Sequence, residues 1–555
     1  MSRKIIPWIA PALLLLASLA CGVAQPPAPA PAPTAAPAAP AATSAPAAAE
    51  PRVVEKVVTQ VVEKEKEVVV AAEPTAAPEP AEAPAAAEAP SPAATAVPRP
   101  ADMFFKEYGV NPFLETNEDH LSTFALDVDT GSYTIARRYV TEGNLPPQEA
   151  VRVEEFVNYF RQDYPLPPKG KAFAVHVDGA PFPFAETPNN RILRIGIQGY
   201  DVPPEERLPA VLTFVIDVSG SMGDNGKLEM VKDALATLVN QLRPDDSVGI
   251  VVYTDDARII MPTTTHDREQ VLQAIEQLQP ENSTNAEAGL RLGYQLAVAA
   301  YKPDASNRVI LCSDGVANVG NITQTSIWQN IQEYAAKGIN LTSIGVGMGE
   351  YNDVLLEQLA DKGKGTYHYV DTLEEAQRLF EQNLTGTLQA IAEDAKVQVD
   401  FNPDAVVRYR LIGFENRAIA DTEFRVETGK AAQIGAGHHV TALYEVELQP
   451  DAPGRIATVY LRWKDPQTKE VIEIKQPLES QDLAPTFTSA SPRLQWSTIV
   501  AEYAEVLRQS PFAMTSTLAA VLEEAQRTSR LLPDDPDVAE FVDLVQRAVQ
   551  VKRGD

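Results

Sequence analysis

The chain has 555 residues, of which 45% are hydrophobic and 22% charged, and its formal net charge is -29. A single hydrophobic core stops growing at roughly 250–300 residues, so the length predicts two or more domains. The acidic excess argues against a nucleic-acid-binding protein, which needs a basic surface to neutralise phosphate. It also argues against adsorption to an anionic membrane by charge alone. Because there are only two cysteines, Cys21 and Cys312, a fold held together by several disulfides is excluded.

Residues 1–21 have the organisation of an export signal. Arg3 and Lys4 are followed by an apolar run from Ile5 to Ala20, which is short for a membrane span of about 20 residues. The run ends in Ser-Leu-Ala-Cys-Gly, which resembles the lipobox of bacterial lipoproteins, although Ser18 stands where that family usually has Leu. The resemblance implies cleavage before Cys21, lipidation of that residue, and a lipid-anchored, extracytoplasmic protein of the bacterial cell envelope. Plain secretion and an uncleaved N-terminal anchor are the alternatives.

Residues 22–100 are dominated by Ala, Pro and Glu, a composition that cannot bury enough apolar surface to fold. We predict a disordered tether that holds the later domains away from the membrane, since proline-rich linkers are extended and semi-rigid. Valine pairs recur every four residues between Val53 and Val62. This spacing is compatible with a short amphipathic helix or a coiled-coil stalk, although valine is a mediocre helix former.

Residues 101–207 mix helical and strand patterns. Helices are predicted after Thr130 and near Val153–Phe160, and strands at Phe173–Val177 and Ile192–Ile197. The sequence Asp-Thr-Gly-Ser from Asp129 also spells the signature of aspartic proteases. That chemistry needs a second aspartate of the same kind, and the sequence has no second Asp-Thr-Gly or Asp-Ser-Gly. A calcium-binding EF-hand from the same segment fails as well, because Arg138 stands where a bidentate Glu belongs.

Residues 208–384 alternate between buried-strand and amphipathic-helix patterns. A helix is predicted from Leu228 to Leu242, where apolar residues recur at spacings of three and four, and others near Asp267–Gln277 and Ala286–Tyr301. The strands are predicted at Val211–Ile216, Ser247–Tyr253, Arg258–Met261, Val309–Cys312, Ile339–Val346 and Gly365–Val370. Such alternation predicts an α/β fold, a doubly wound and mostly parallel sheet covered on both faces.

Polar residues follow the ends of two of these strands. Asp217 follows the first strand and Asp314 follows the strand that ends at Cys312, so both carboxylates are expected at the carboxyl edge of the sheet, where α/β proteins bind ligands. Ser219 and Ser221 lie on the loop after Asp217, and Thr284 lies just before a helix. These are hard oxygen ligands, which suit Mg²⁺, Mn²⁺ or Ca²⁺ better than zinc.

The sequence Asp-Val-Ser-Gly-Ser at 217–221 resembles the DxSxS motif of von Willebrand factor type A (VWA) domains, and Thr284 and Asp314-Gly315 stand where that family has its threonine and second aspartate. The resemblance implies a metal-ion-dependent adhesion site (MIDAS) of Asp217, Ser219, Ser221, Thr284 and Asp314. In the family, an Asp or Glu of a partner protein completes the coordination of the ion. Two alternatives remain: the five residues only cap loops and helices, or a structural metal never meets a ligand.

The part of the chain that follows residue 384 is predicted to be rich in β-strands at first and helical towards its end. Residues 385–484 predict strands at Val397–Phe401, Val406–Ile412, Val440–Val446 and Ile456–Trp463. Residues 485–555 predict helices, with Trp496, Ile499, Tyr503 and Leu507 on one face. The segment before the VWA domain, with Asp-Val-Asp-Thr at 127–130 and Val-Arg-Val-Glu-Glu at 151–155, resembles the N-terminal region of one bacterial subfamily of VWA proteins, and the C-terminal part resembles its partner region of unknown function. We hypothesise that both flanks form one β-sandwich into which the VWA domain is inserted.

The sequence therefore predicts a binding protein with a lipid anchor, a divalent metal and an acidic protein ligand. The rival interpretation is an envelope-assembly scaffold with a purely structural metal. An enzyme is not expected, because no Ser-His-Asp, HExxH or phosphate-loop motif is present. His438-His439 is interpreted as part of a loop, Asp224 and Asn225 as turn residues, and Cys312 as a buried thiol without a redox role.

Overall fold

The structure is a computed structural model that describes residues 103–185, 187–265, 267–281, 283–315, 324–347, 351–427, 433–450 and 454–554. The predicted signal peptide, Cys21, the tether and the valine-rich segment lie outside these residues, so their predictions stand as made. The elements described below all belong to the unit Pro90–Asp555. Within the described ranges, no helix is both long and apolar enough to cross a membrane.

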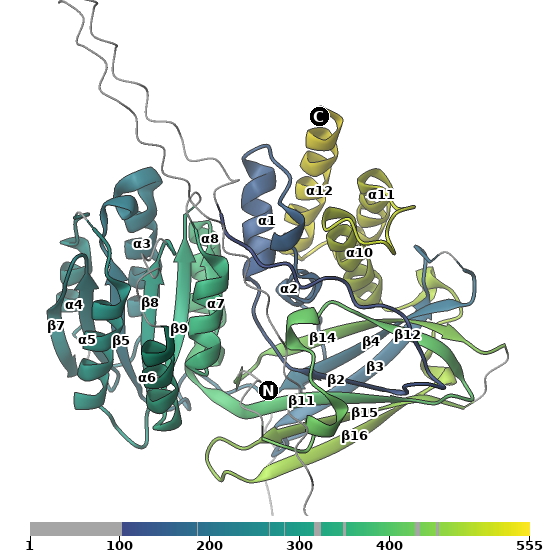
Figure 1. Ribbon diagram of the computed structural model, residues 1–555, viewed down its shortest axis with the longest axis horizontal. Coiled ribbons are helices and arrows are strands. Elements are labelled where there is room, and N and C mark those ends of the chain that lie inside the picture. The colour runs from purple at the N-terminus through teal and green to yellow at the C-terminus, as the bar shows by residue number, and fades with distance from the viewer. Residues whose placement is uncertain are drawn as a thin grey trace, which may run out of the picture. The chain divides into compact units, whose positions relative to one another are not determined.

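A six-stranded sheet forms the centre of the predicted VWA domain (Figure 1). Every neighbouring pair is parallel except the edge pair β6–β7, which is antiparallel. The inner strands are apolar and buried on both faces, as parallel strands between two layers of helices must be. In spatial order the strands are β10 (Tyr367–Val370), β9 (Ile339–Val346), β8 (Ser306–Ser313), β5 (Ala210–Asp217), β6 (Ser247–Tyr253) and β7 (Ala257–Thr265).

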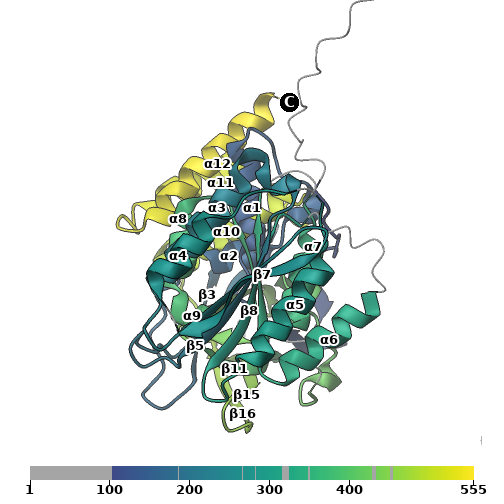
Figure 2. The same cartoon turned by 90° about the vertical axis from the view of Figure 1, so that its left-hand side faces the viewer.

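Helices cover both faces of this sheet, which confirms the doubly wound prediction. Figure 2 shows α3 (Lys227–Asn240), α4 (Arg268–Glu276) and α8 (Leu373–Gln377) on one side of the strands. The opposite side carries α5 (Ala286–Ala299), α6 (Gln324–Ala336) and α7 (Asp353–Lys362). The η3 turn (Gly220–Gly226) joins β5 to α3, and η5 (Arg378–Gln382) and α9 (Leu384–Leu388) lead out of the domain.

The two flanks of the VWA domain fold together into a β-sandwich. Strands from before and after the insertion pair antiparallel in both sheets: Leu193 lies opposite Tyr444, and Phe124 lies opposite Val397. The hypothesis that both flanks form one sandwich around an inserted domain is therefore confirmed. One sheet has the order β1 (Leu114–Glu115), β12 (Val406–Ile412), β14 (His439–Leu448), β4 (Asn190–Gly199) and β3 (Phe173–Pro181). The other has β13 (Ile434–Gly435), β11 (Ala390–Phe401), β15 (Arg455–Lys464) and β16 (Val471–Glu479), with β2 (Leu121–Ala125) paired to β11.

A helical layer packs on the outer face of the β4–β14 pair (Figure 1). It comprises α1 (Gly131–Thr141), α2 (Val153–Tyr159), α10 (Pro492–Leu507), α11 (Leu518–Ser529) and α12 (Pro536–Gly554). Trp496 is fully buried, with its ring edge-on to those of Phe160 and Phe541 at 5.8 and 5.2 Å between centroids. Sequence predicted one apolar face for this helix, but almost every residue of α10 is buried, because helices and sheet surround it.

Short 3-10 turns complete the described chain at Gln148–Ala150, Glu415–Arg417, Asp421–Glu423, Ser480–Asp482 and Phe487–Ser489. Two predictions need correction. His439 is the first residue of β14 and not part of a loop, since it pairs with Gln198 of β4. β-Structure begins at Ala390 rather than directly after Leu384, because α9 intervenes.

Buried ion pairs fix the VWA domain to the sandwich. Arg417 of the sandwich pairs with Asp127 at 2.6 Å and Asp129 at 3.4 Å, and with Glu357 and Asp361 of α7 at 3.2 and 2.9 Å. The segment that spells a protease or calcium-site signature is therefore part of a structural ion-pair cluster. Such clusters fix register and orientation more than they add net stability, because burying charges is costly.

Candidate metal centre

The two predicted aspartates lie at the carboxyl edge of the central sheet. Asp217 is the last residue of β5, and Asp314 directly follows β8, the parallel neighbour of β5, in which Cys312 lies opposite Ile216. Both residues are at most 1% exposed. Parallel strands end at the same edge of a sheet, and this topology brings together two carboxylates that are far apart in the sequence.

Hydrogen bonds hold the carboxylate of Asp217 in a fixed orientation. Oδ1 accepts from the backbone N–H of Ser219 at 2.9 Å. Oδ2 accepts from the Tyr253 hydroxyl at 3.1 Å and from the Ser313 hydroxyl at 3.0 Å. Burial, and then the negative charge of Asp314, raise the pKa of Asp217 to about 6. A buried carboxylate whose pKa is raised by a neighbouring negative charge favours a cation beside it.

Hydroxyl groups stand beside the carboxylates. The Oγ atoms of Ser219 and Ser221 are 3.1 Å apart, on the loop that leaves β5. The backbone N–H of Glu281 donates to the carbonyl of Val218 at 2.6 Å, which ties this loop to the segment that carries Thr284. Within the described residues, no hydrogen bond joins Thr284 itself to the other four predicted ligands. The structure thus groups Asp217, Ser219, Ser221 and Asp314 and places Thr284 on the neighbouring loop.

The site also contains a lysine that the sequence patterns did not predict to lie there. Nζ of Lys227, the first residue of α3, lies 2.9 Å from Oδ2 of Asp314, and both side chains are buried. The lysine stem runs beside Gly347, where a β-carbon would come within 2.6 Å of it. The only sequence signal was a lysine directly before Leu228, the first residue of the predicted apolar face of this helix. Lys227 supplies positive charge to the acidic edge, so any metal ion must share Asp314 with an ammonium group.

The donor set fits a hard divalent cation. Its members offer only carboxylate and hydroxyl oxygens, the ligands that Mg²⁺, Mn²⁺ and Ca²⁺ prefer. Among the described residues, no group of three or more His, Cys, Asp or Glu side chains could hold a metal by itself, so a site here depends on the serine hydroxyls. Asp217, Ser219, Ser221 and Asp314 would hold the ion, with Thr284 as the fifth candidate. A bound ion would supply an electrophilic centre for an incoming oxygen ligand.

The remaining residues near the site have structural roles. Asn225 and Gly226 adopt positive φ angles of 51° and 72°, so this segment forms the predicted turn before α3. Cys312 is a buried free thiol, and burial raises its pKa well above the usual range. A low thiolate fraction and no solvent access make this cysteine unreactive, as predicted.

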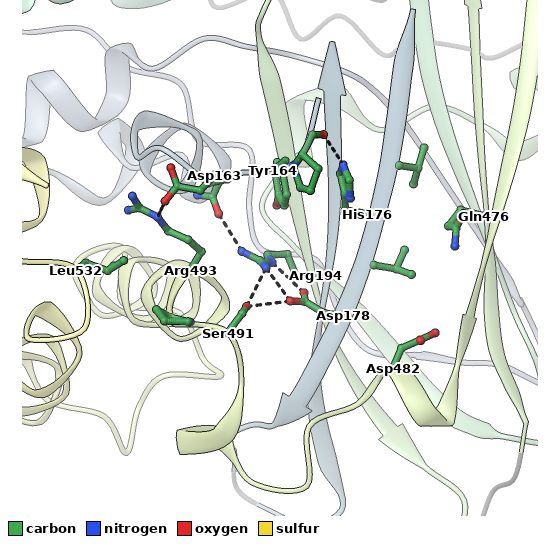
Figure 3. Close-up of a pocket in the computed structure, with 15 residues that line it drawn as sticks. Asp163, Tyr164, His176, Asp178, Arg194, Gln476, Asp482, Ser491, Arg493 and Leu532 are labelled. Carbon is green, nitrogen blue, oxygen red and sulfur yellow. Dashed lines mark hydrogen bonds and ion pairs between the residues drawn. The ribbon is translucent and has the colours of Figure 1, made fainter. Parts of the chain in front are cut away.

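A separate pocket of about 600 Å³ opens on the sandwich, between β3, β4 and the start of α10 (Figure 3). Its charged groups are already paired. Arg194 donates to both carboxylate oxygens of Asp178 at 2.9 and 2.7 Å, and Arg493 donates to Asp163 at 2.6 Å. Ser491 bridges Arg194 and Asp178. Because these side chains satisfy one another, the pocket shows no polar group that requires a ligand.

Family comparisons agree with this architecture. Residues 99–194 match the family model described as von Willebrand factor, residues 212–382 match the von Willebrand factor type A domain, and residues 386–551 match the C-terminal region of uncharacterized protein YfbK. The uncharacterized protein YfbK of Escherichia coli (strain K12) is 34% identical over 484 residues, which cover 82% of each chain. The chain belongs to the YfbK family. The VWA resemblance and the two family-typical flanks are thereby confirmed.

More distant relatives share parts of the YfbK-family chain. Uncharacterized protein sll0103 of Synechocystis sp. is 25% identical over 348 residues, or 61% of this chain and 80% of that protein. Inter-alpha-trypsin inhibitor heavy chain H2 of Mus musculus is 29% identical over 33% of this chain and 21% of its own length. Among solved structures, von Willebrand factor type A from Catenulispora acidiphila is similar at 16% identity and a TM-score of 0.39, over 67% of this chain and 89% of that one. Proximal thread matrix protein 1 from the mussel byssus, with a zinc-occupied MIDAS motif, is similar at 22% identity and a TM-score of 0.27, over 34% and 48%.

Proposed function

We propose that this protein is an adhesion-type binding protein that recognises an acidic residue of a protein partner through a divalent metal, with Mg²⁺ as the expected ion. VWA domains as a family support a protein-interaction role. The observation that carries the finer proposal is the grouping of Asp217, Asp314 and the hydroxyls of Ser219 and Ser221 at one edge of the sheet. A metal held by few charged ligands stays electrophilic, and a partner carboxylate is the hard anionic ligand that suits it.

The location proposed is the bacterial cell envelope, outside the cytoplasmic membrane. The support is the lipobox-like sequence at Cys21 and the proline-rich stretch that follows it. Metabolic labelling with a radioactive or clickable fatty acid tests the anchor. Label incorporation and membrane fractionation should both be lost in Cys21→Ser, whereas Cys312→Ser should keep both. If the Cys21→Ser protein is still labelled and membrane-bound, the proposed lipid anchor at Cys21 is wrong. That result would not bear on the proposed metal site.

The rival function is an envelope-assembly scaffold in which the metal is structural and the sandwich binds the partner. The ion-pair cluster of Arg417 favours a VWA domain held firmly on the sandwich, which either function could use. The rival predicts that partner binding survives loss of the metal ligands. The leading proposal predicts that the partner no longer binds once the metal is removed.

Affinity capture from envelope extract separates the two. The full-length protein in detergent is immobilised and compared in Mg²⁺, in EDTA, and as Ser219→Ala/Ser221→Ala in Mg²⁺. The double serine variant removes two hydroxyl ligands and leaves the buried Lys227–Asp314 pair intact, so we expect it to fold. Asp245→Ala is the matched control, because Asp245 is an exposed aspartate on the loop before β6, at the opposite edge of the sheet.

A partner captured only by the wild type and the Asp245→Ala control in Mg²⁺ would support metal-dependent recognition. The partner's Asp and Glu residues should then be replaced one at a time with Asn and Gln. We expect replacement at one position to abolish capture. A partner retained in EDTA and by the serine variant would contradict the proposal and favour the scaffold.

A further inference from the structure

Arg308 is a buried cation with no counter-ion in the part of the chain that the structure describes. It lies near the start of β8, at the opposite edge of the sheet from the metal centre, and is 3% exposed. Its Nη1 donates to the Thr342 hydroxyl at 2.7 Å, and its Nε has no hydrogen-bond partner. Among the residues that the structure describes, no carboxylate pairs with Arg308. Burial alone lowers its pKa to about 10.

The other buried arginines of this protein are paired. Arg137, Arg152, Arg410 and Arg417 each contact at least two carboxylates. This is the expected pattern, because a buried charge without a partner is costly. On the sandwich side, burial, His439 and Arg308 together lower the pKa of His438 to about 4, so this neighbouring group adds no negative charge. A negative charge from outside the described residues would compensate this cation.

A cavity of about 810 Å³ reaches Arg308 between the VWA domain and the sandwich. Its walls come from the amino ends of β8 and β9, from β11, and from the turn between β15 and β16. Five basic and two acidic side chains line it, although the whole protein carries a net charge of -29. The basic residues are Arg308, Lys337, Lys364, Lys464 and Lys469, and the acidic ones are Asp304 and Glu393.

Local pairing neutralises only part of this lining. Lys469 pairs with Glu393 at 3.0 Å, and Lys464 pairs with Glu427 at 2.8 Å. No ion pair among the described residues engages Arg308, Lys337 or Lys364. A concave, positively charged surface with one desolvated guanidinium concentrates anions, because a low-dielectric wall strengthens the field of its charges. The planar guanidinium also matches the paired oxygens of carboxylate and phosphate groups.

We propose that this cavity binds a small-molecule polyanion, a compound with two or more phosphate or carboxylate groups, whose oxygens pair with Arg308 and Lys364. The volume exceeds that of a single inorganic ion and suits a small metabolite. The ligand would touch both the VWA domain and the sandwich, and its binding does not depend on the metal centre at the opposite edge of the sheet.

The test is thermal unfolding of the full-length protein in detergent with pyrophosphate or citrate as probe. All samples contain EDTA, so that chelation of a metal by either probe has no effect, and sodium chloride equalises the ionic strength. We expect at least one of the two probes at about 10 mM to raise the Tm by roughly 2 °C or more. The ratio of the two shifts tells a phosphate ligand from a carboxylate ligand.

Arg308→Met should lose this shift and, without probe, should be at least as stable as the wild type, because it removes an unpaired buried charge. Arg258→Met is the matched control, since Arg258 is an exposed arginine of the same sheet, paired with Glu281. Lys364→Asn tests the second proposed contact, and asparagine tolerates the positive φ of 51° at this position. Calorimetric titration should show that this variant binds the probe at least several-fold more weakly than the wild type does. The proposal is overturned if neither probe stabilises the wild type beyond chloride, if Arg308→Met keeps the shift, or if Lys364→Asn binds with unchanged affinity.

Discussion

Lys227 Nζ lies 2.9 Å from Asp314 Oδ2 in a region where the lysine side chain is 6% exposed and the aspartate side chain 1%. An ammonium group therefore occupies one oxygen of a carboxylate that the metal proposal also needs. In water such a pair would be weak, but burial strengthens the attraction and makes the loss of either partner costly. The lysine thus stabilises the acidic edge without metal and would compete with a metal ion for Asp314.

Replacing Lys227 with Met should separate these two effects. Without metal, we expect the free energy of unfolding to fall by about 3 kcal/mol, because Asp314 loses a buried ion-pair partner. With the competing ammonium gone, we expect Mg²⁺ to bind roughly tenfold more tightly. Urea unfolding in EDTA and calorimetric Mg²⁺ titration measure the two quantities. Lys232→Met is the control, since Lys232 lies on the same helix and pairs with the exposed Glu229. Weaker Mg²⁺ binding in Lys227→Met would show that the lysine supports the site instead of competing for it.

Tyr253 supports the site from the neighbouring strand. Its hydroxyl donates to Oδ2 of Asp217 at 3.1 Å, from a fully buried ring. Tyr253→Phe removes this donor and keeps the ring, so we expect Mg²⁺ affinity to fall by about tenfold or more, as for other residues that orient metal ligands. The matched Tyr301→Phe, at an exposed tyrosine, should bind as the wild type does. Equal affinities in the two variants would mean that Asp217 needs no such orientation.

The Arg417 cluster makes a prediction about assembly. Arg417→Met leaves Asp127 and Asp129 buried without their cation, so we expect a loss of about 3–5 kcal/mol in the free energy of unfolding. Arg425→Met breaks an exposed pair with Glu473 and should change stability by less than about 1 kcal/mol. Urea unfolding at pH 7 compares them. Similar small changes in the free energy of unfolding of both variants would show that the Arg417 cluster does not hold the VWA domain on the sandwich.

Glu502 gives a pH dependence with a defined sign. Burial raises its pKa to about 8, and Oε1 has no hydrogen-bond partner. The unfolded chain releases this proton near pH 4.5, whereas the folded protein keeps it to about pH 8. The folded state therefore binds more protons between these values, and the contribution of Glu502 to stability falls as the pH rises through this window.

Glu502→Gln should remove the loss of stability that Glu502 causes as the pH rises. We expect the variant and the wild type to differ little at pH 5, and the variant to be more stable by about 2 kcal/mol or more at pH 8. Glu523→Gln, at an exposed position on α11, should show no such divergence. Parallel pH profiles for Glu502→Gln and the wild type would contradict the raised pKa.

The central sheet was predictable because its strands are continuous apolar runs between turn residues. Ser247–Tyr253 and Ile339–Val346 of this sheet were predicted with the bounds that the structure shows, and so was Val406–Ile412 of the sandwich. The strand β16 was missed, because its apolar residues are only partly buried on an edge and Lys475, Gln476 and Pro477 interrupt them. The grouping of Asp217 with Asp314 followed from the rule that parallel strands share a carboxyl edge.

Pairings between distant charged residues could not be predicted. Neither Lys227 with Asp314 nor Arg417 with Asp127 follows from local periodicity, since a buried charge and a surface charge look alike in one sequence. Arg308 is the same case: its place near the start of a strand is compatible with an exposed edge, and only the packed sandwich shows that it is buried. The family match fixes the fold, and these contacts decide what each edge of the VWA domain can bind.

The most direct test of the central claim is calorimetric titration of MgCl₂ into the EDTA-treated and dialysed full-length protein, with Ser219→Ala/Ser221→Ala beside it. We predict one Mg²⁺ site per chain in the wild type, and binding at least tenfold weaker in the double serine variant with unchanged thermal stability in EDTA. No saturable binding by the wild type, or equal binding by the two proteins, would contradict a metal centre at this edge of the sheet.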